Sequence, residues 1–154
     1  MIKLSPLAVM TAAVQSISTT GRMPFGVRQV YIVSGGTVTG DRIKGTILPG
    51  GGDFLLVDPS GLGHVDARLT WQTGDGAHIY VQYDGRVVMS EVVGNAFKSG
   101  GACNFGDTYF ITQLRFETGD SRYAWLNGTM ALGEGRVAEN RSIQYNIYAC
   151  EHAK

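Results

Sequence analysis

Strict alternation of apolar and polar side chains is the feature of this sequence that most restricts its fold. Successive side chains of a β-strand point to opposite faces, so a period of two predicts a strand with one apolar face. Residues 66–73, DARLTWQT, show this period, and residues 77–83 and 109–117 repeat it. The two faces of the first segment are Ala67, Leu69, Trp71 and Thr73 on one side, and Asp66, Arg68, Thr70 and Gln72 on the other. The polar face is either a solvated outer surface or the wall of a partly polar ligand cavity.

Strand patterns and turn signals divide the rest of the chain into short segments. We expect strands over residues 7–18, 27–34, 37–48, 53–57, 64–73, 77–83, 84–94, 108–118, 123–135 and 142–150. The sequence GDG at 74–76 is a hairpin signal. Residues 95–107, NAFKSGGACNFGD, are the least regular stretch and are expected to form a mobile loop beside a site.

A chain with so many strands must protect their edges, and a closed barrel does this best. No segment sustains the 3.6-residue period of a helix, so long helices are not expected. The sequence therefore predicts an all-β protein folded as an antiparallel β-barrel, with a β-sandwich as the alternative. No linker or repeat divides the chain, so residues 1–154 are expected to form one domain.

Composition argues against several classes of partner. Thirteen basic and thirteen acidic residues give a formal net charge of zero, and no Lys/Arg cluster marks a nucleic-acid binder. No apolar run reaches membrane-spanning length, so no membrane partner is expected. Cys103 and Cys150 lack CxxC spacing, and we interpret them as free thiols in a reducing cytoplasm.

Motifs for metals and cofactors are missing from the sequence. His64, His78 and His152 have neither HxH nor HExxH spacing. The glycine-rich segments lack the Lys and Ser/Thr of a phosphate-binding loop, and GLGHVD at 61–66 lacks the third glycine of a dinucleotide fingerprint. We therefore expect neither a metal nor a cofactor.

Asp53 occupies an unusual place for a carboxylate, in LPGGGDFLLV at residues 48–57, directly before an apolar run. Because Asp is depleted in strands and costly to desolvate, it either ends a solvated turn or points into a cavity. In a cavity, burial would raise its pKa and a neighbouring Arg would lower it, so the sequence does not fix the net shift. A carboxyl group with a raised pKa would be suited to acid–base chemistry near neutrality. Arg68 and Tyr80 would then donate hydrogen bonds to a developing oxyanion. The candidate catalytic residues are thus Asp53, Arg68 and Tyr80, and a structural Asp53–Arg68 ion pair is the alternative.

Three linked segments resemble the signatures of domain-of-unknown-function family 3237. They are GGTVTGDRIKGTILPGGGDF at 35–54, DARLTWQTGDGAHIYVQYDGR at 66–86 and YFITQLRFETGDSRYAWLNG at 109–128. The sequence departs from the family pattern at Gly52, where Ala is common, and at Gly74, where a polar residue is more usual. The resemblance implies a lipocalin-like, calycin-type β-barrel with a central cavity, and it implies no particular reaction.

These observations lead us to expect a cofactor-independent acid–base enzyme of the isomerase, cyclase, hydratase or lyase type. Its substrate would be a small apolar molecule, carbonyl-bearing or aromatic, bound in the barrel cavity. A non-catalytic lipocalin-like carrier is the alternative, and the ionisable content of the cavity separates the two.

The residues expected to bind the small molecule are Phe25, Tyr109, Glu117, Trp125 and Asn127. Trp125 and Asn127 lie two positions apart and would share one strand face, whereas Glu117 has surface pairing with Arg115 as its alternative. Exposed aromatic residues and strand edges also favour a homodimer.

Overall fold

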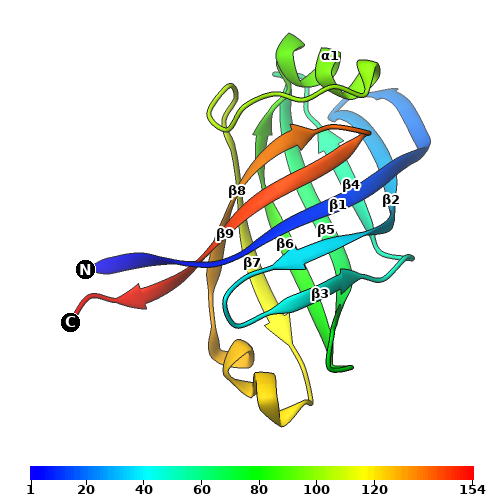
Figure 1. Cartoon of the computed structure of the whole chain (residues 1–154). Coiled ribbons are helices and arrows are strands. Elements are labelled where there is room, and N and C mark those ends of the chain that lie inside the picture. Colours follow the sequence, from blue (N-terminus) through cyan, green and yellow to red (C-terminus); the bar gives the residue numbers. More distant parts are fainter.

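The computed structural model describes residues 1–154 and shows a single antiparallel sheet that closes on itself (Figure 1). The strands are β1 (Ile2–Met23), β2 (Gly26–Thr39), β3 (Lys44–Ile47), β4 (Gly52–Val57), β5 (Leu62–Thr73), β6 (His78–Val88), β7 (Phe110–Glu117), β8 (Ala131–Ala138) and β9 (Ser142–His152). Two short helices complete the chain, α1 (Glu91–Ser99) and the 3-10 helix η1 (Ser121–Gly128). The predicted all-β, antiparallel barrel is therefore confirmed.

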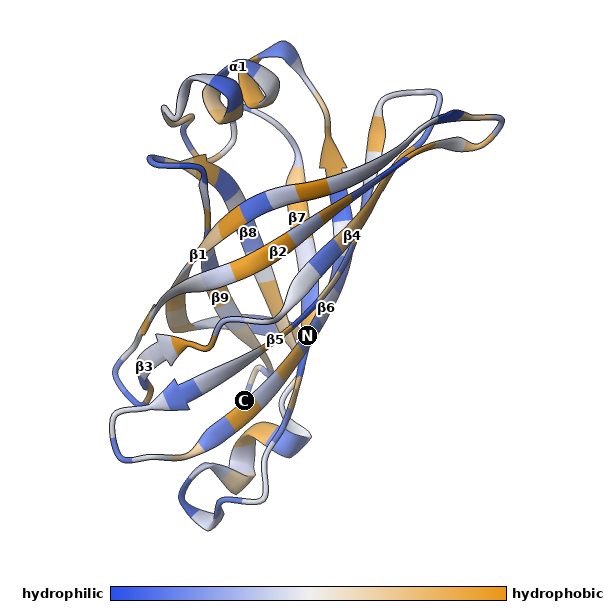
Figure 2. Cartoon of the chain, turned by 90° about the vertical axis from the view of Figure 1, so that its right-hand side faces the viewer, coloured by the Kyte–Doolittle hydropathy of each residue, from blue (hydrophilic) through white to orange (hydrophobic).

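The ring follows the order of the chain. Except for β3 and β4, strands that follow each other in sequence pair with each other, and β1 pairs with both β2 and β9, which closes the barrel. β3 and β4 share one position, because both lie between β2 and β5. Figure 2 shows apolar and polar residues alternating along the strands, as the sequence predicts for a wall with one buried face.

A glycine-rich bulge separates β3 from β4. From Gly45 to Gly52 this chain segment advances seven residues, while β5 advances five between the partners Thr73 and Arg68. Gly50 has a φ of +110°, and a side chain at Gly51 would lie 2.5 Å from the carbonyl oxygen of Arg68. Only glycine tolerates such geometry, so these residues let β4 start tightly against β5.

The half of the interior nearer η1 is tightly packed. Its largest side chains are fully buried: Trp71, Met10, Ile79, Leu114 and Leu126. The indole N–H of Trp71 donates to the sulfur of Met10 at 3.2 Å, and its ring lies 5.5 Å from that of Phe116. Side chains therefore fill the interior of the barrel at this end, and the space inside the barrel lies toward α1.

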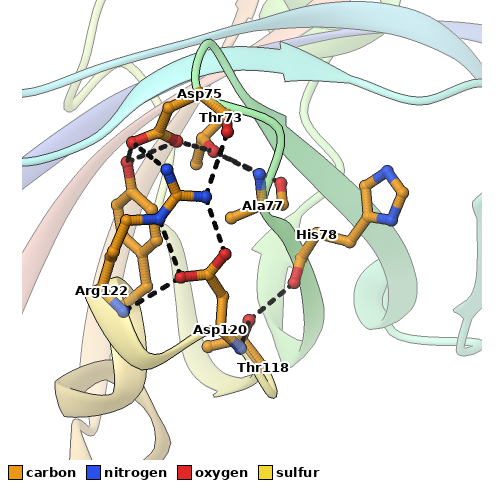
Figure 3. Close-up of polar contacts among 8 residues, drawn as sticks. Thr73, Asp75, Ala77, His78, Thr118, Asp120 and Arg122 are labelled. Carbon is orange, nitrogen blue, oxygen red and sulfur yellow. Dashed lines mark hydrogen bonds and ion pairs between the residues drawn. The ribbon is translucent and has the colours of Figure 1, made fainter.

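An ion-pair network fastens η1 to the β5–β6 hairpin (Figure 3). The Arg122 guanidinium lies 2.8 Å from a carboxylate oxygen of Asp120 and 3.3 Å from one of Asp75. The Tyr123 hydroxyl donates to the same Asp75 carboxylate at 2.9 Å. These contacts hold Tyr123 and Leu126 as a plug in the end of the barrel.

Both helices replace strand or loop predicted from sequence. The expected strand over 84–94 and the expected loop over 95–107 are wrong over residues 91–99, which form α1. The helix begins after Ser90, whose hydroxyl accepts a hydrogen bond from the N–H of Val93. It ends at Gly100, whose φ of 72° is left-handed. The expected strand over 123–135 is wrong in its first half, because Asp120 caps η1 by accepting the N–H of Arg122. Neither α1 nor η1 has the length and apolar character of a membrane-crossing helix.

Candidate functional site

A cavity of about 260 Å³ lies in the half of the barrel covered by α1. Fifteen of its nineteen lining residues are hydrophobic, including Phe97 of α1 and Phe110 of β7. The polar side chains among the others are Gln29, Asp53 and Lys98. Three tyrosines also reach the cavity: Tyr31, Tyr83 and Tyr145. The site is thus an apolar pocket with a few polar groups, which is the usual form of a small-molecule site.

The pairing register places Asp53 in a row of inward-facing residues that crosses four strands. Tyr31 of β2 pairs with Asp53 of β4, Asp53 with Ala67 of β5, and Ala67 with Tyr83 of β6. Ala67 is buried and has the smallest side chain of the row. The two tyrosines therefore flank the carboxylate, with only a methyl group between Asp53 and Tyr83.

The Asp53 carboxylate fills a gap in the β4–β5 ladder. The two strands pair at Asp53–Ala67 and again at Leu56–His64, with no paired residues between these points. Within this gap the backbone N–H of Asp66 donates to a carboxylate oxygen of Asp53 at 3.0 Å. The hydrogen bond fixes the orientation of the carboxylate toward the cavity.

Burial raises the pKa of Asp53 to about 6. The Asp66 N–H hydrogen bond and the positive charge of Arg28 lower this pKa, and the negative charge of Asp66 raises it, but desolvation is the largest effect. A carboxyl group with such a pKa exchanges a proton near neutrality. It is therefore suited to act as a general base or acid.

The tyrosine hydroxyls of the cavity remain protonated over the same range. Burial, and then the charge of Asp53, raise the pKa of Tyr31 and Tyr83 above the usual value. Burial also raises the pKa of Tyr145, whose ring lies 5.4 Å from that of Tyr83. The Tyr31 hydroxyl already donates to Gln29 at 2.8 Å, and the Tyr145 hydroxyl donates to that of Tyr83. Tyr83 is therefore the better hydrogen-bond donor toward a ligand.

Two of the predicted catalytic residues lie outside the barrel. Arg68 is exposed on the outer face of β5, and its guanidinium lies 3.5 Å from the hydroxyl of Tyr80 on β6. Their neighbours Ala67 and Val81 take the inward positions. The expectation that Arg68 and Tyr80 approach Asp53 is corrected by this alternation, and no Asp53–Arg68 ion pair forms.

The five predicted ligand-binding residues also lie away from the cavity. Phe25 and Tyr109 are exposed at strand ends, and Glu117 is exposed on the outer face of β7, where it pairs with Tyr80. The Arg42 guanidinium lies over the ring of Trp125, with 3.6 Å between the guanidinium carbon and the ring centre. The Asn127 amide oxygen accepts a hydrogen bond from the backbone N–H of Thr118 at 2.8 Å, and its NH2 group donates to the Thr118 carbonyl oxygen at 2.9 Å. Trp125 and Asn127 share no strand face, since both belong to η1.

Sequence reasoning missed Tyr31, Tyr83 and Tyr145, although a signal for Tyr83 was present. Tyr83 has the same parity as Ile79 and Val81, which are fully buried. The alternation allows the polar face of this strand as a cavity wall, but in the structure its apolar face lines the cavity, through Tyr83. No three acidic, histidine or cysteine side chains come together in an arrangement that could hold a metal ion.

The chain is similar to proteins whose sequences or structures are known. It is 33% identical over 133 residues to a UPF0311 protein of Rhodopseudomonas palustris, which covers 86% of this chain and 87% of that protein. A β-barrel-like protein of Acinetobacter baumannii has 32% identity and a TM-score of 0.79, over 98% of this chain and 97% of that one. An enzyme from Penicillium herquei shares the fold with a TM-score of 0.68 at 20% identity, over 97% and 95% of the two chains.

The family described as a protein of unknown function, DUF3237, matches residues 2–150. This match spans the barrel strands, the bulge before Asp53 and all the cavity walls. The resemblance noted from the sequence motifs is thus confirmed over nearly the whole chain. The chain belongs to the DUF3237 family.

Proposed function

We propose that this protein is a cofactor-independent acid–base enzyme that acts on a small, apolar, carbonyl-bearing molecule in the cavity under α1. Asp53 is its general base, and Tyr83, whose hydroxyl accepts a hydrogen bond from Tyr145, is its oxyanion donor. The observation that carries the proposal is a carboxylate with a pKa of about 6 inside an otherwise apolar, tyrosine-lined pocket. Such perturbed groups in a cavity are typical of catalytic sites.

The reaction begins with proton transfer from a carbon next to the substrate carbonyl to a carboxylate oxygen of Asp53. The electron pair of the broken C–H bond moves into the carbonyl, and the oxygen becomes an enolate stabilised by tyrosine hydroxyls. Return of the proton from Asp53 to a different carbon completes an isomerisation. In a cyclisation, the enolate carbon instead attacks a second carbonyl carbon of the same molecule, the C=O π bond of that carbonyl opens as the ring bond forms, and Asp53 gives its proton to the resulting alkoxide. Loss of a leaving group from the enolate instead completes an elimination. Isomerisation, cyclisation and elimination begin with this transfer. Hydration is the elimination of water in reverse: water adds to the conjugated double bond, and the sequence ends when Asp53 gives a proton to the enolate carbon.

Two further observations bear on the choice between catalysis and transport. The structure from Penicillium herquei that shares this fold is described as an enzyme, so a barrel of this kind supports catalysis in that protein. The mainly hydrophobic lining, in contrast, would suit a carrier equally well. The two functions differ in whether Asp53 reacts with the bound molecule.

The elimination reaction of 5-nitrobenzisoxazole tests this difference, because a desolvated carboxylate removes its single acidic C–H proton and the ring opens to a coloured phenolate. We expect the protein-dependent rate to rise with pH through about 6, the pKa of Asp53. The Asp53→Asn variant should retain its fold and lose this rate. Asp41→Asn, which changes an exposed carboxylate outside the cavity lining, is the matched control and should keep it.

A protein-dependent rate that survives in Asp53→Asn would overturn the assignment of the base. A wild-type protein that binds the compound without accelerating its reaction would favour the carrier.

A further inference from the structure

Lys98 is the only cationic side chain that lines the cavity. It lies in the last turn of α1 and is exposed while also bordering the pocket, which places it at the mouth. The other polar side chain at the lining besides Asp53 is Gln29, whose amide oxygen already accepts the Tyr31 hydroxyl. Lys98 is therefore the group that an entering ligand with a negative charge would meet.

The backbone around Lys98 is fixed to the barrel wall. The Arg141 guanidinium donates to the carbonyl oxygen of Lys98 at 3.0 Å, and the N–H of Asn140 donates to the carbonyl of Gly100 at 3.0 Å. Both partners belong to the turn between β8 and β9. Phe97, the preceding residue, packs edge-on against Tyr31 with ring centres 5.6 Å apart. These contacts hold the last turn of α1, and with it Lys98, in a constant position over the cavity.

The ammonium group of Lys98 has no carboxylate partner. None of the three ion pairs of the protein includes it. No ion pair joins Lys98 to Asp53, the only acidic residue of the lining. The cation at the mouth and the carboxylate on the wall are therefore separated, with apolar lining between them.

We infer that the ligand of this cavity is an apolar molecule that carries an acidic oxygen group, and that Lys98 binds this group at the mouth. The inference rests on the proposed function and adds a substrate class to it: the reacting end lies at Asp53 and the anionic end at Lys98. A carboxylate or phenolate provides the required charge. Lys98 also suits the negative end of the α1 dipole, and an anion at the mouth would gain a charge-assisted hydrogen bond from it that a neutral ligand would not.

Two fluorescent probes with the same aromatic skeleton test the inference. They are 8-anilinonaphthalene-1-sulfonate, which is an anion, and N-phenyl-1-naphthylamine, which is neutral. We expect Lys98→Met to weaken binding of the anion by about five- to tenfold while the Kd of the neutral probe stays unchanged. Lys98→Arg should restore the affinity for the anion, and Lys3→Met, which removes an exposed lysine far from the pocket, should change neither value.

A variant that fills the cavity shows where the probes bind. Gly94 of α1 lines the pocket, and a Cβ there would meet no atom within 4 Å. Gly94→Leu should therefore abolish binding of both probes.

Equal losses for both probes in Lys98→Met, no loss for the anion, or no binding to the wild-type chain would each overturn the inference. The test reads binding alone, so it is separate from the test of catalysis. A Lys98-dependent preference for the anion, with no Asp53-dependent elimination, would contradict only the proposed base.

Discussion

The carboxylate of Asp53 and the backbone N–H of Asp66 form a 3.0 Å hydrogen bond where β4 and β5 lack paired residues. The strand ladder thus gives up backbone pairing to orient a side chain. The single hydrogen bond does not offset the desolvation of the carboxylate, since the pKa of Asp53 remains raised to about 6. A group of this kind favours function over stability, and its removal should show both effects.

Asp53→Asn should stabilise the folded state at alkaline pH. The raised pKa means that the folded chain binds the proton more tightly than the unfolded chain, so wild-type stability falls as pH rises from about 4 through 6. At pH 8 we expect the variant to gain about 1–2 kcal/mol in the free energy of unfolding, since Asn keeps the acceptor oxygen for Asp66. Urea denaturation at pH 4 and pH 8 measures this, and the gain should vanish at the lower pH. A variant that is less stable at pH 8 would show that a positive charge compensates Asp53.

Tyr83→Phe should slow the Asp53-dependent elimination without unfolding the barrel. Loss of one oxyanion donor reduces turnover by about 10²-fold in enzymes that depend on such donors. Tyr80→Phe is the matched control, because Tyr80 lies on the same strand and faces outward. Steady-state rates for the two variants decide between the inner and outer tyrosines. A larger loss of the elimination rate in Tyr80→Phe than in Tyr83→Phe would indicate that the site lies on the outer face of the barrel.

Gly94→Ala should stabilise the protein by about 1 kcal/mol, which is the difference in helix propensity between the two residues. Gly94 is in α1 and the added methyl group enters open space, so no clash opposes the gain. Thermal unfolding measures the effect. A loss of stability would mean that α1 needs the flexibility of glycine at this point.

Arg122→Gln should lower the melting temperature by a few degrees and leave the cavity reaction unchanged, because the network of Figure 3 lies at the opposite end of the barrel. Hydrogen bonds from Arg122 lower the pKa of Asp120 to about 2. This contribution to stability is present above about pH 4, the unfolded value, and is lost as pH falls toward 2. The wild-type advantage over the variant should therefore disappear in acid and shrink in high salt. An equal difference at pH 2 and pH 7 would contradict the electrostatic explanation.

The barrel could be predicted from the sequence because the alternation of apolar and polar side chains within short segments indicates strands with one buried face. Residues 66–73 show it clearly, and every residue assigned to the apolar face there is buried. The helices were missed because their signals are short. Ser90 and Gly100 mark the ends of α1, yet only nine residues lie between the caps, too few for a clear helical period.

The site could be predicted only for Asp53. The glycines before it predict a sharp turn of the backbone, and the bulge at Gly50 and Gly51 is that turn. The side-chain chemistry of Arg68 and Tyr80 suggests that they lie beside Asp53, but the alternation alone does not say which face of a strand points into the barrel. The row from Tyr31 to Tyr83 depends on the pairing register of four strands, which only the folded chain defines.

The pairing of β1 with β9 joins the two ends of the chain. The other pairs join strands that are neighbours in sequence or one strand removed, whereas this seam pairs the first strand with the last. Ala12 of β1 and Tyr145 of β9 both line the cavity, so the pocket is incomplete until the seam forms. A molecule that fills the cavity would contact β1 and β9 together, so its binding would stabilise the closed seam by mass action.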